Sequence, residues 1–358
     1  MKHMAKSIFS SLFQNAQKRN RTVSFLIVII AYAVLESMMR SGNLSSLFTS
    51  LLVPMTCYIV AAIGLNLNVG ISGELNLGQA GFMSVGAFTG VSISGLLANT
   101  VPNDTVRLII AIISGIVAAA IFGLIIGVPV LKLQGDYLAI VTLAFGQILK
   151  SIITNIYFGF DSAGLHFSFV ENKTSLLPGG KMLMNGPMGA TGTNKISNFT
   201  TGVILILLSL IVVYNLMDSK SGRAIMAARD NRIAAESTGI PILSTKMLSF
   251  LVSACLGGAA GALYGLNYST LVPAKFDFNT SILILVYVVL GGLGNMTGTI
   301  IATIVLVLLP EFLRSMQDYR MLIYAIVLIL IMILTNNEDL KVRMSRFSLK
   351  SILMRKKG

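Results

Sequence analysis

Long apolar runs with very few charges constrain this 358-residue chain more than any other feature. Hydrophobic residues make up 54% of the sequence and charged residues only 11%, and the mean hydropathy is +0.81. A soluble domain carries about 25% charged residues, because its surface has to be hydrated. This chain has too little charge to cover such a surface, so we expect lipid to be its solvent.

Ten apolar runs follow one another, and several of them are shorter than the length of about 20 residues that a full membrane crossing needs. They occupy residues 22–39, 47–69, 81–98, 106–131, 137–157, 200–217, 247–268, 281–293, 298–313 and 321–335. The run from 281 to 313 counts twice only if its central glycines divide it. We therefore expect an all-α polytopic helical bundle: one transmembrane domain at residues 22–335 with about ten membrane segments, some short or broken.

Basic residues gather beside these runs. Of the 27 Lys and Arg residues, 17 lie in residues 1–21, 218–246 and 336–358. Basic flanks are retained in the cytoplasm, so we expect both terminal tails and the loop 218–246 to be cytoplasmic in a cell inner membrane. The polar loop 158–199 then lies outside, either as a solvated loop or as a contact surface for an extracytoplasmic partner. The basic tracts lack interleaved aromatic residues, so nucleic acid is not an expected partner.

Other short features carry less weight. Residues 1–35 resemble a cleaved signal peptide, although an uncleaved first span explains them without a leader. The two cysteines lie inside apolar runs, which favours small buried residues over a disulfide. The two histidines have no ligand-type neighbours at metal spacing, so neither a metal nor another cofactor is expected.

Two apolar regions, residues 64–81 and 291–298, are interrupted by glycine and polar residues. Irregular backbone at membrane depth survives only where it is buried in protein or lines a wet cavity, and broken helices often mark a transport pathway. Close helix packing through small residues is the alternative. Glu74 is either a functional carboxylate or one hydrated at an interface. The residues that we expect along a pathway are Glu74, Asn76, Gln79, Gly291 and Asn295.

The loop 218–246 is predicted to contain a short basic helix. Residues 223–238 are good helix formers, Gly239 can adopt the left-handed conformation that ends a helix, and Pro241 forbids continuation. The next span can be capped by Ser244 or Thr245. Such a helix lies on lipid phosphates or in a groove of a partner protein. A partner would also contact the side formed by Ile225, Ala228 and Ile233.

Four blocks of the sequence resemble the branched-chain amino-acid permeases of ABC importers of the LivM type. They are residues 73–82, 135–143, 222–240 and 291–298, which occur in the family's order. Within the third block, Ala234, Ala235 and Gly239 are similar to the Glu-Ala-Ala-x-x-x-Gly pattern of the cytoplasmic coupling loop. This chain departs from that pattern, because Ile233 stands where the family has Glu.

The resemblance implies a permease subunit that translocates branched-chain or related amino acids delivered by an extracytoplasmic binding protein. It implies three kinds of partner: that binding protein, a second homologous permease and two cytoplasmic ATPases. The chain contains no Gly-x-x-x-x-Gly-Lys-[Ser/Thr] phosphate loop, so we expect a non-catalytic subunit with ATP hydrolysis on its partners. The ATPase-coupling residues would be Arg223, Arg229, Arg232, Ala234, Ala235 and Gly239.

Three other functions are weighed against this one. A permease of the same family for urea or nucleosides shares every motif. An ion-coupled secondary transporter needs ionisable groups within the membrane, and the candidates are few: Glu74, Asp136 and Glu311. An intramembrane enzyme needs a nucleophile–base pair or a metal constellation, for which the sequence offers no cluster.

Overall fold

The structure is a computed structural model. It describes residues 2–42, 45–98, 100–133, 135–161, 164–170 and 180–313, with isolated positions 322, 323, 325, 326 and 329. Residues up to Thr303 form one compact unit, and residues from Ile304 onward form a second. The expected tail 336–358 and most of the run 321–335 lie outside the described residues.

Helices make up most of the described chain. They are α1 (Lys2–Arg40), α2 (Ser46–Asn66), α3 (Gln79–Leu96), α4 (Asp104–Val130), α5 (Asp136–Thr154), α6 (Phe199–Asp218), α7 (Lys220–Asp230), α8 (Arg232–Ser237), α9 (Ile242–Gly265), α10 (Phe278–Gly291) and α11 (Met296–Phe312), with the π-helix η1 (Leu67–Ser72) continuing α2. Among the described residues, seven helical segments are long and apolar enough to cross a membrane, and α11 is shorter. This supports a helical membrane protein. It does not confirm the expected count of about ten.

One face of α4 shows how the sequence separates lipid from the interior. Its small residues recur every four positions and are buried, namely Ala111, Gly115, Ala119 and Gly123. Its large apolar residues on the other face are about half exposed, namely Ile113, Val117, Ile121 and Ile125. Large side chains therefore face outward and small ones inward, which lets membrane helices approach closely.

Helices α3 and α9 approach each other closely at glycines. A Cβ on Gly86 would lie 2.0 Å from the carbonyl oxygen of Gly258, and a Cβ on Gly261 would lie 1.9 Å from that of Met83. Both cysteines are free thiols, and Cys57 is fully buried whereas Cys255 is only partly buried.

The first helix is longer than a membrane is thick. At 39 residues, α1 extends about 58 Å, and its candidate span covers Arg21–Arg40. It packs on α6, where Arg21 forms an ion pair with Asp218 at 2.7 Å and the Ser24 and Tyr214 hydroxyls are 2.8 Å apart.

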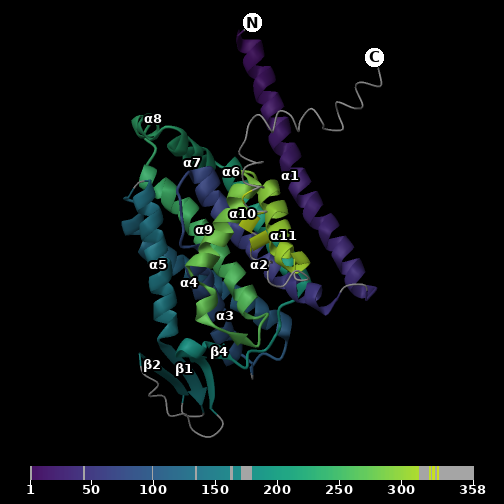
Figure 1. The fold of residues 1–358 in the computed structure, drawn as a ribbon. Helices are drawn as coiled ribbons and strands as arrows, with labels where there is room; N and C mark the ends of the chain where they lie inside the picture. The colour runs from purple at the N-terminus through teal and green to yellow at the C-terminus, as the bar shows by residue number, and fades with distance from the viewer. Residues whose placement is uncertain are drawn as a thin grey trace. The chain divides into compact units, whose positions relative to one another are not determined.

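The polar loop expected at residues 158–199 contains strands, so the all-α prediction is wrong for this segment. An antiparallel sheet has the order β2 (Gly164–Phe169), β1 (Ile156–Asp161), β3 (Lys181–Asn185), and β4 (Ala190–Thr191) pairs with β5 (Thr270–Leu271). Aromatic and apolar residues alternate with others along β2, a pattern that favours strands. The sheet follows α5, at the end opposite α7 and α8 (Figure 1).

The α3–α9 contact predicts a stability effect. Replacing Gly86 with Ala forces the two backbones apart, which we expect to cost about 1–3 kcal/mol and to lower the thermal unfolding midpoint of the purified protein. Val117→Ile, which enlarges a side chain on the exposed face of α4, is the control and should leave the midpoint unchanged. An unchanged midpoint for Gly86→Ala would contradict this packing.

Candidate functional site

The first interrupted region is built from η1 and a stretch without regular secondary structure, residues 73–78, that leads into α3. Gly73 ends η1 with φ 75°. Its Cα packs against the side chain of Arg229 on α7, so that an added Cβ would collide with it. At the other end, the Gln79 side chain bonds Ser253 about midway along α9. The stretch therefore runs from the α7 end of the bundle into its interior without helical hydrogen bonds.

Side chains of neighbouring helices supply the hydrogen bonds that this backbone lacks. The N–H of Leu77 donates to Thr142 Oγ1 on α5 at 3.0 Å. The N–H of Ala80 donates to Ser281 Oγ on α10 at 3.1 Å. A buried N–H without a partner is rare in native structures, so these hydroxyls are what permits an irregular backbone here.

The predicted pathway residues Asn76 and Gln79 lie in the interior of the chain, and neither is exposed at all. Asn76 Oδ1 accepts from the N–H of Gly78 at 2.8 Å. Gln79 Nε2 donates to the carbonyls of Ala61 at 3.3 Å and Ser253 at 3.2 Å. In this conformation the Gln79 amide joins α3 to α2 and α9, whereas the Asn76 amide makes only a local bond to the backbone.

Glu74 is a buried carboxylate with a charged partner. It forms an ion pair with Lys246, near the start of α9, and the two side chains are only 10% and 12% exposed. A hydrated position at an interface is therefore wrong for Glu74. Sequence reasoning missed Lys246. Its signal was an isolated basic residue at the start of a span, which a buried carboxylate elsewhere would need as a partner.

The second interrupted region meets the first. The glycines divide the run as predicted, because α10 ends at Gly291 and α11 begins at Met296. Asn66, at the end of α2, accepts from the N–H of Gly294 at 2.8 Å and donates to Thr299 Oγ1 at 2.7 Å. One fully buried amide thus joins the two breaks.

The outer part of this second loop is open. Gly291 is half-buried and Asn295 is exposed, and Asn295 Oδ1 accepts from the N–H of Gly298 at 3.3 Å. Sequence reasoning placed both residues on a pathway. The structure brings their loop to Asn66, which sequence reasoning did not single out.

Three buried polar atoms along the first region have no hydrogen-bond partner. They are Asn68 Nδ2, Ser72 Oγ and Asn76 Nδ2. Unsatisfied buried polar groups are costly and few in native proteins. Three of them within nine residues therefore indicate that this segment has polar groups that helix packing alone does not explain.

The predicted cytoplasmic helix is two helices. Asn231 takes an extended conformation between α7 and α8, and its Oδ1 accepts from the N–H of Ala234 at 3.0 Å. The single helix over 223–238 is therefore wrong, because the Asn side chain competes for the backbone and caps a new helix. The cap expected at Ser244 or Thr245 is also wrong, because α9 begins at Ile242 after Pro241.

Gly239 ends α8 as predicted. Its φ is 82°, and the N–H of Ile240 donates to the carbonyl of Ala235 at 3.1 Å. This is the hydrogen-bond pattern of a Schellman cap. Ala235 and Ile240 then pack with Ala228 and Ile242 in one small apolar cluster, so the cap fixes α8 against the rest of the chain.

The expected docking side is only partly available. Ile225 is 1% exposed and Ala228 is 5% exposed, because both pack inward, so assigning them to a partner contact was wrong. Ile233, by contrast, is 80% exposed. The other predicted coupling residues divide likewise, with Ala235 buried and Arg223, Arg232 and Ala234 exposed.

Arg229 stands apart from the other predicted coupling residues, because it contacts the membrane-embedded part of the chain. Its Nη1 donates to the carbonyl oxygen of Gly70 in η1 at 3.1 Å. Arg232, by comparison, pairs with Glu236 within its own helix at 3.0 Å. Of the two arginines, Arg229 thus bridges α7 to the first interrupted region.

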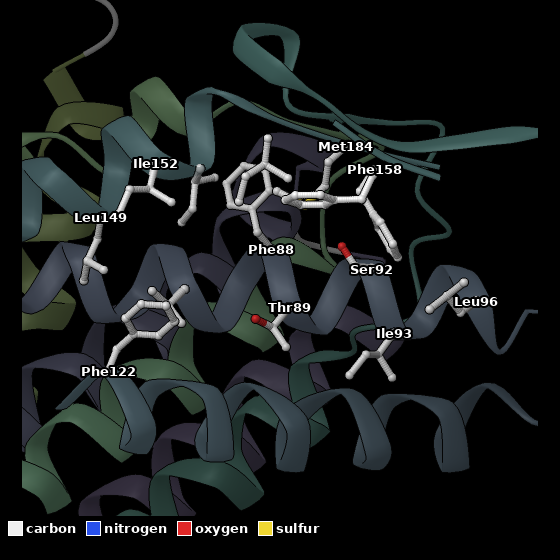
Figure 2. A pocket seen from close by; sticks show the side chains of 14 residues that line it. Phe88, Thr89, Ser92, Ile93, Leu96, Phe122, Leu149, Ile152, Phe158 and Met184 are labelled. Atoms are coloured by element: carbon white, nitrogen blue, oxygen red, sulfur yellow. The ribbon is translucent and has the colours of Figure 1, made fainter. Parts of the chain in front are cut away.

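Two cavities of similar size differ in chemistry. One, of about 350 Å³, is lined by Arg229, Asn295, Thr297 and apolar side chains of η1, α6 and α7. The other, of about 360 Å³, lies between α3, α4, α5 and the sheet, where Thr89 and Ser92 stand among aromatic and aliphatic residues (Figure 2). A charged solute would lose its hydration in the second without gaining ionic partners, so the first suits such a solute better.

Comparison with known proteins identifies the family. Residues 47–332 match the family described as "Branched-chain amino acid transport system / permease component". The high-affinity branched-chain amino acid transport system permease protein LivM of Escherichia coli (strain K12) is 33% identical over 86% of this chain and 72% of its own length. No solved structure matches.

More distant relatives carry other names. The fructose import permease protein FruG of Bifidobacterium longum is 26% identical over 79% of this chain and 78% of its own length. The guanosine ABC transporter permease protein NupQ of Bacillus subtilis is 25% identical over 60% and 67%, respectively. The family match covers most of the chain, and the alignment with LivM covers 86% of it. This chain therefore belongs to the permease-component family of branched-chain amino acid transport systems.

Proposed function

We propose that the chain is the membrane permease subunit of an ABC importer for branched-chain or related amino acids. The observation that carries this is α8, which is exposed except at Ala235 and presents Ile233 at 80% exposure. An apolar side chain so exposed on a short helix is suited to a groove on another protein. Exposed α8 and the cap at Gly239 together suit a coupling surface for an ATPase subunit.

The proposed assembly has four kinds of chain: this permease, a second homologous permease, two ATPases and an extracytoplasmic binding protein. This subunit would contribute no catalytic step, since ATP would be hydrolysed on its partners. The basic loop that carries α7 and α8 would face the cytoplasm of the inner membrane, with both termini on the same side. The sheet at the opposite end would then face the binding protein.

The proposed translocation route passes along the first interrupted region and the loop after α10. Support comes from the unpartnered atoms of Asn68, Ser72 and Asn76, because a route that is wet in one state leaves polar groups short of partners when it closes. Glu74, Gln79, Gly291 and Asn295 border the same stretch. The route opens in a conformation other than this one.

An ion-coupled secondary transporter fits less well. Its strongest candidate group, Glu74, is already neutralised by Lys246, and such a transporter gives α7 and α8 no role. A permease for nucleosides, urea or sugars remains the alternative within the family, and relatives named for fructose and guanosine illustrate that range. Identity to LivM is higher, at 33%.

The assembled importer is expected to accumulate radiolabelled leucine in vesicles when loaded binding protein and ATP are supplied on their respective sides. Removing ATP should abolish uptake, whereas ionophores that collapse proton and sodium gradients should leave it unchanged. Preference for guanosine, urea or fructose over leucine would overturn the substrate assignment. Uptake without ATP that ionophores abolish would identify a secondary transporter.

Replacing Gly239 with Val is expected to misdirect α8. No atom lies within 4 Å of the Cβ position, so the effect comes from the left-handed backbone alone, at about 1–2 kcal/mol. Leucine uptake should fall severalfold while membrane insertion stays normal. Gly239→Asn is the matched control, because Asn tolerates this conformation, and it should retain most uptake. Normal uptake by Gly239→Val would count against the coupling role.

The route is tested by single cysteines at positions 74–80 in a background lacking Cys57 and Cys255. A small hydrophilic thiol reagent should label them little in the resting state, because positions 74, 76 and 78–80 are buried and 75 and 77 are only partly exposed. Labelling should appear when the ATPases are trapped with nucleotide. A cysteine at the exposed position 220 is the positive control. Protection of all seven positions in every trapped state would remove the route from this stretch.

A further inference from the structure

The side chain of Arg229 is 41% exposed, yet its guanidinium contacts the membrane-embedded part of the chain. Its Nη1 donates to the Gly70 carbonyl oxygen at 3.1 Å. Its Nε and Nη2 donate to Asp230 Oδ1 at 3.0 Å and 2.8 Å. The neighbouring carboxylate thus holds the guanidinium while its free end reaches into the membrane-embedded part of the chain. The planar guanidinium has donors for both contacts at once.

The acceptor lies where a positive charge is favoured. Gly70 belongs to the last turn of η1, whose carbonyls lack helical partners and carry the negative end of the helix dipole. A single turn of π-helix is itself an uncommon feature that is frequent at functional sites. Arg229 therefore caps the C-terminal end of η1, which the stretch 73–78 follows directly.

Two glycines make room for this contact. A Cβ on Gly73 would lie 2.7 Å from Arg229 Cγ. A Cβ on Gly70 would lie 2.1 Å from Asn66 Oδ1 and 2.2 Å from the Gly294 nitrogen. Three segments thus converge on two residues without side chains: α7 through Arg229, α2 through Asn66, and the loop after α10 through Gly294.

We infer that Arg229 is a positioning residue that transmits movement of α7 to the irregular stretch 73–78, rather than a docking residue for the ATPase. This rests on the proposed function. The mechanical path is short, because the N–H of Glu74 donates to the Asn68 carbonyl at 3.1 Å and so ties the stretch back to η1. A displacement of α7 acts on Gly70 and Gly73 directly and reaches the buried Asn76 and Gln79 along the same backbone.

The test uses the complete importer in vesicles with Arg229→Lys and Arg229→Ala. Both variants should co-purify with the ATPases and keep their basal ATP hydrolysis. Stimulation by leucine-loaded binding protein, and leucine uptake per ATP, should fall about tenfold in both, because a hydrogen bond to a charged group is lost. Lysine keeps the charge but cannot reproduce the fork, so a role in charge alone predicts rescue by Arg229→Lys. Lys220→Gln removes a charge from the same helix and should behave as wild type.

A double-mutant cycle separates the contact from backbone strain. Gly73→Ala in the wild-type background places a methyl group on Arg229 and should also reduce coupling. In the Arg229→Ala background that contact is gone, so Gly73→Ala should add much less, whereas the strain of φ 75° is common to both backgrounds. Equal effects in the two backgrounds would overturn the inference.

Two further outcomes would overturn it. One is wild-type coupling by Arg229→Ala. The other is loss of the ATPases from the purified Arg229→Ala complex, which would place the residue in the docking surface. Failure of the proposed function would be recognised separately, because vesicles with the wild-type importer would then show no leucine uptake.

Discussion

Breaking a helix inside a membrane exposes backbone N–H and C=O groups that lipid cannot satisfy, and the interior of this chain is organised by that demand. Leu77 in the stretch 73–78 donates to a hydroxyl group on α5, and Ala80 in the first turn of α3 donates to one on α10. The loop after α10 obtains a hydrogen-bond partner from Asn66. Glycines at the crossings let the neighbouring backbones come close enough for these bonds. The first role of these polar side chains is therefore to provide hydrogen-bond partners for backbone groups outside regular helix.

Other polar contacts connect α7 and the stretch 73–78 to the middle of the bundle. Arg229 joins α7 to η1, the Glu74–Lys246 ion pair joins the stretch to α9, and Gln79 reaches the middle of α9. These contacts therefore lie between the helix pair α7 and α8 and the region that holds the unpartnered polar atoms of Asn68, Ser72 and Asn76. Coupling between distant sites needs such a contiguous connection with two arrangements. This chain supplies the connection, and the proposed ATPase partners would supply the force.

Local signals in the sequence were sufficient for the apolar helices and for single turns. The apolar runs from 22 to 313 match observed helices, and in α1 the candidate span, to within about five residues, the glycines divide the run at Gly291, and Gly239 ends α8 with positive φ. Two features were beyond reach because they depend on pairing between remote segments: Lys246 as the partner of Glu74, and the contact of Arg229 with Gly70. The hairpin of β1 and β2 is local, and its alternating pattern was not recognised. The capping by Asn231 was readable, since Asn favours N-caps, but helix propensity on both sides concealed it. The run at 321–335 lies outside the described residues.

The central claim is that α7 and the stretch 73–78 move as one through Arg229. The most direct measurement is a pair of structures of the complete importer in a membrane mimetic, one free of nucleotide and one trapped with it. The account predicts that Arg229 Nη1 stays near 3.1 Å from the Gly70 oxygen while residues 73–78 shift with α7 against α9. A trapped state in which α7 has left Gly70, and residues 73–78 have not moved, would contradict it.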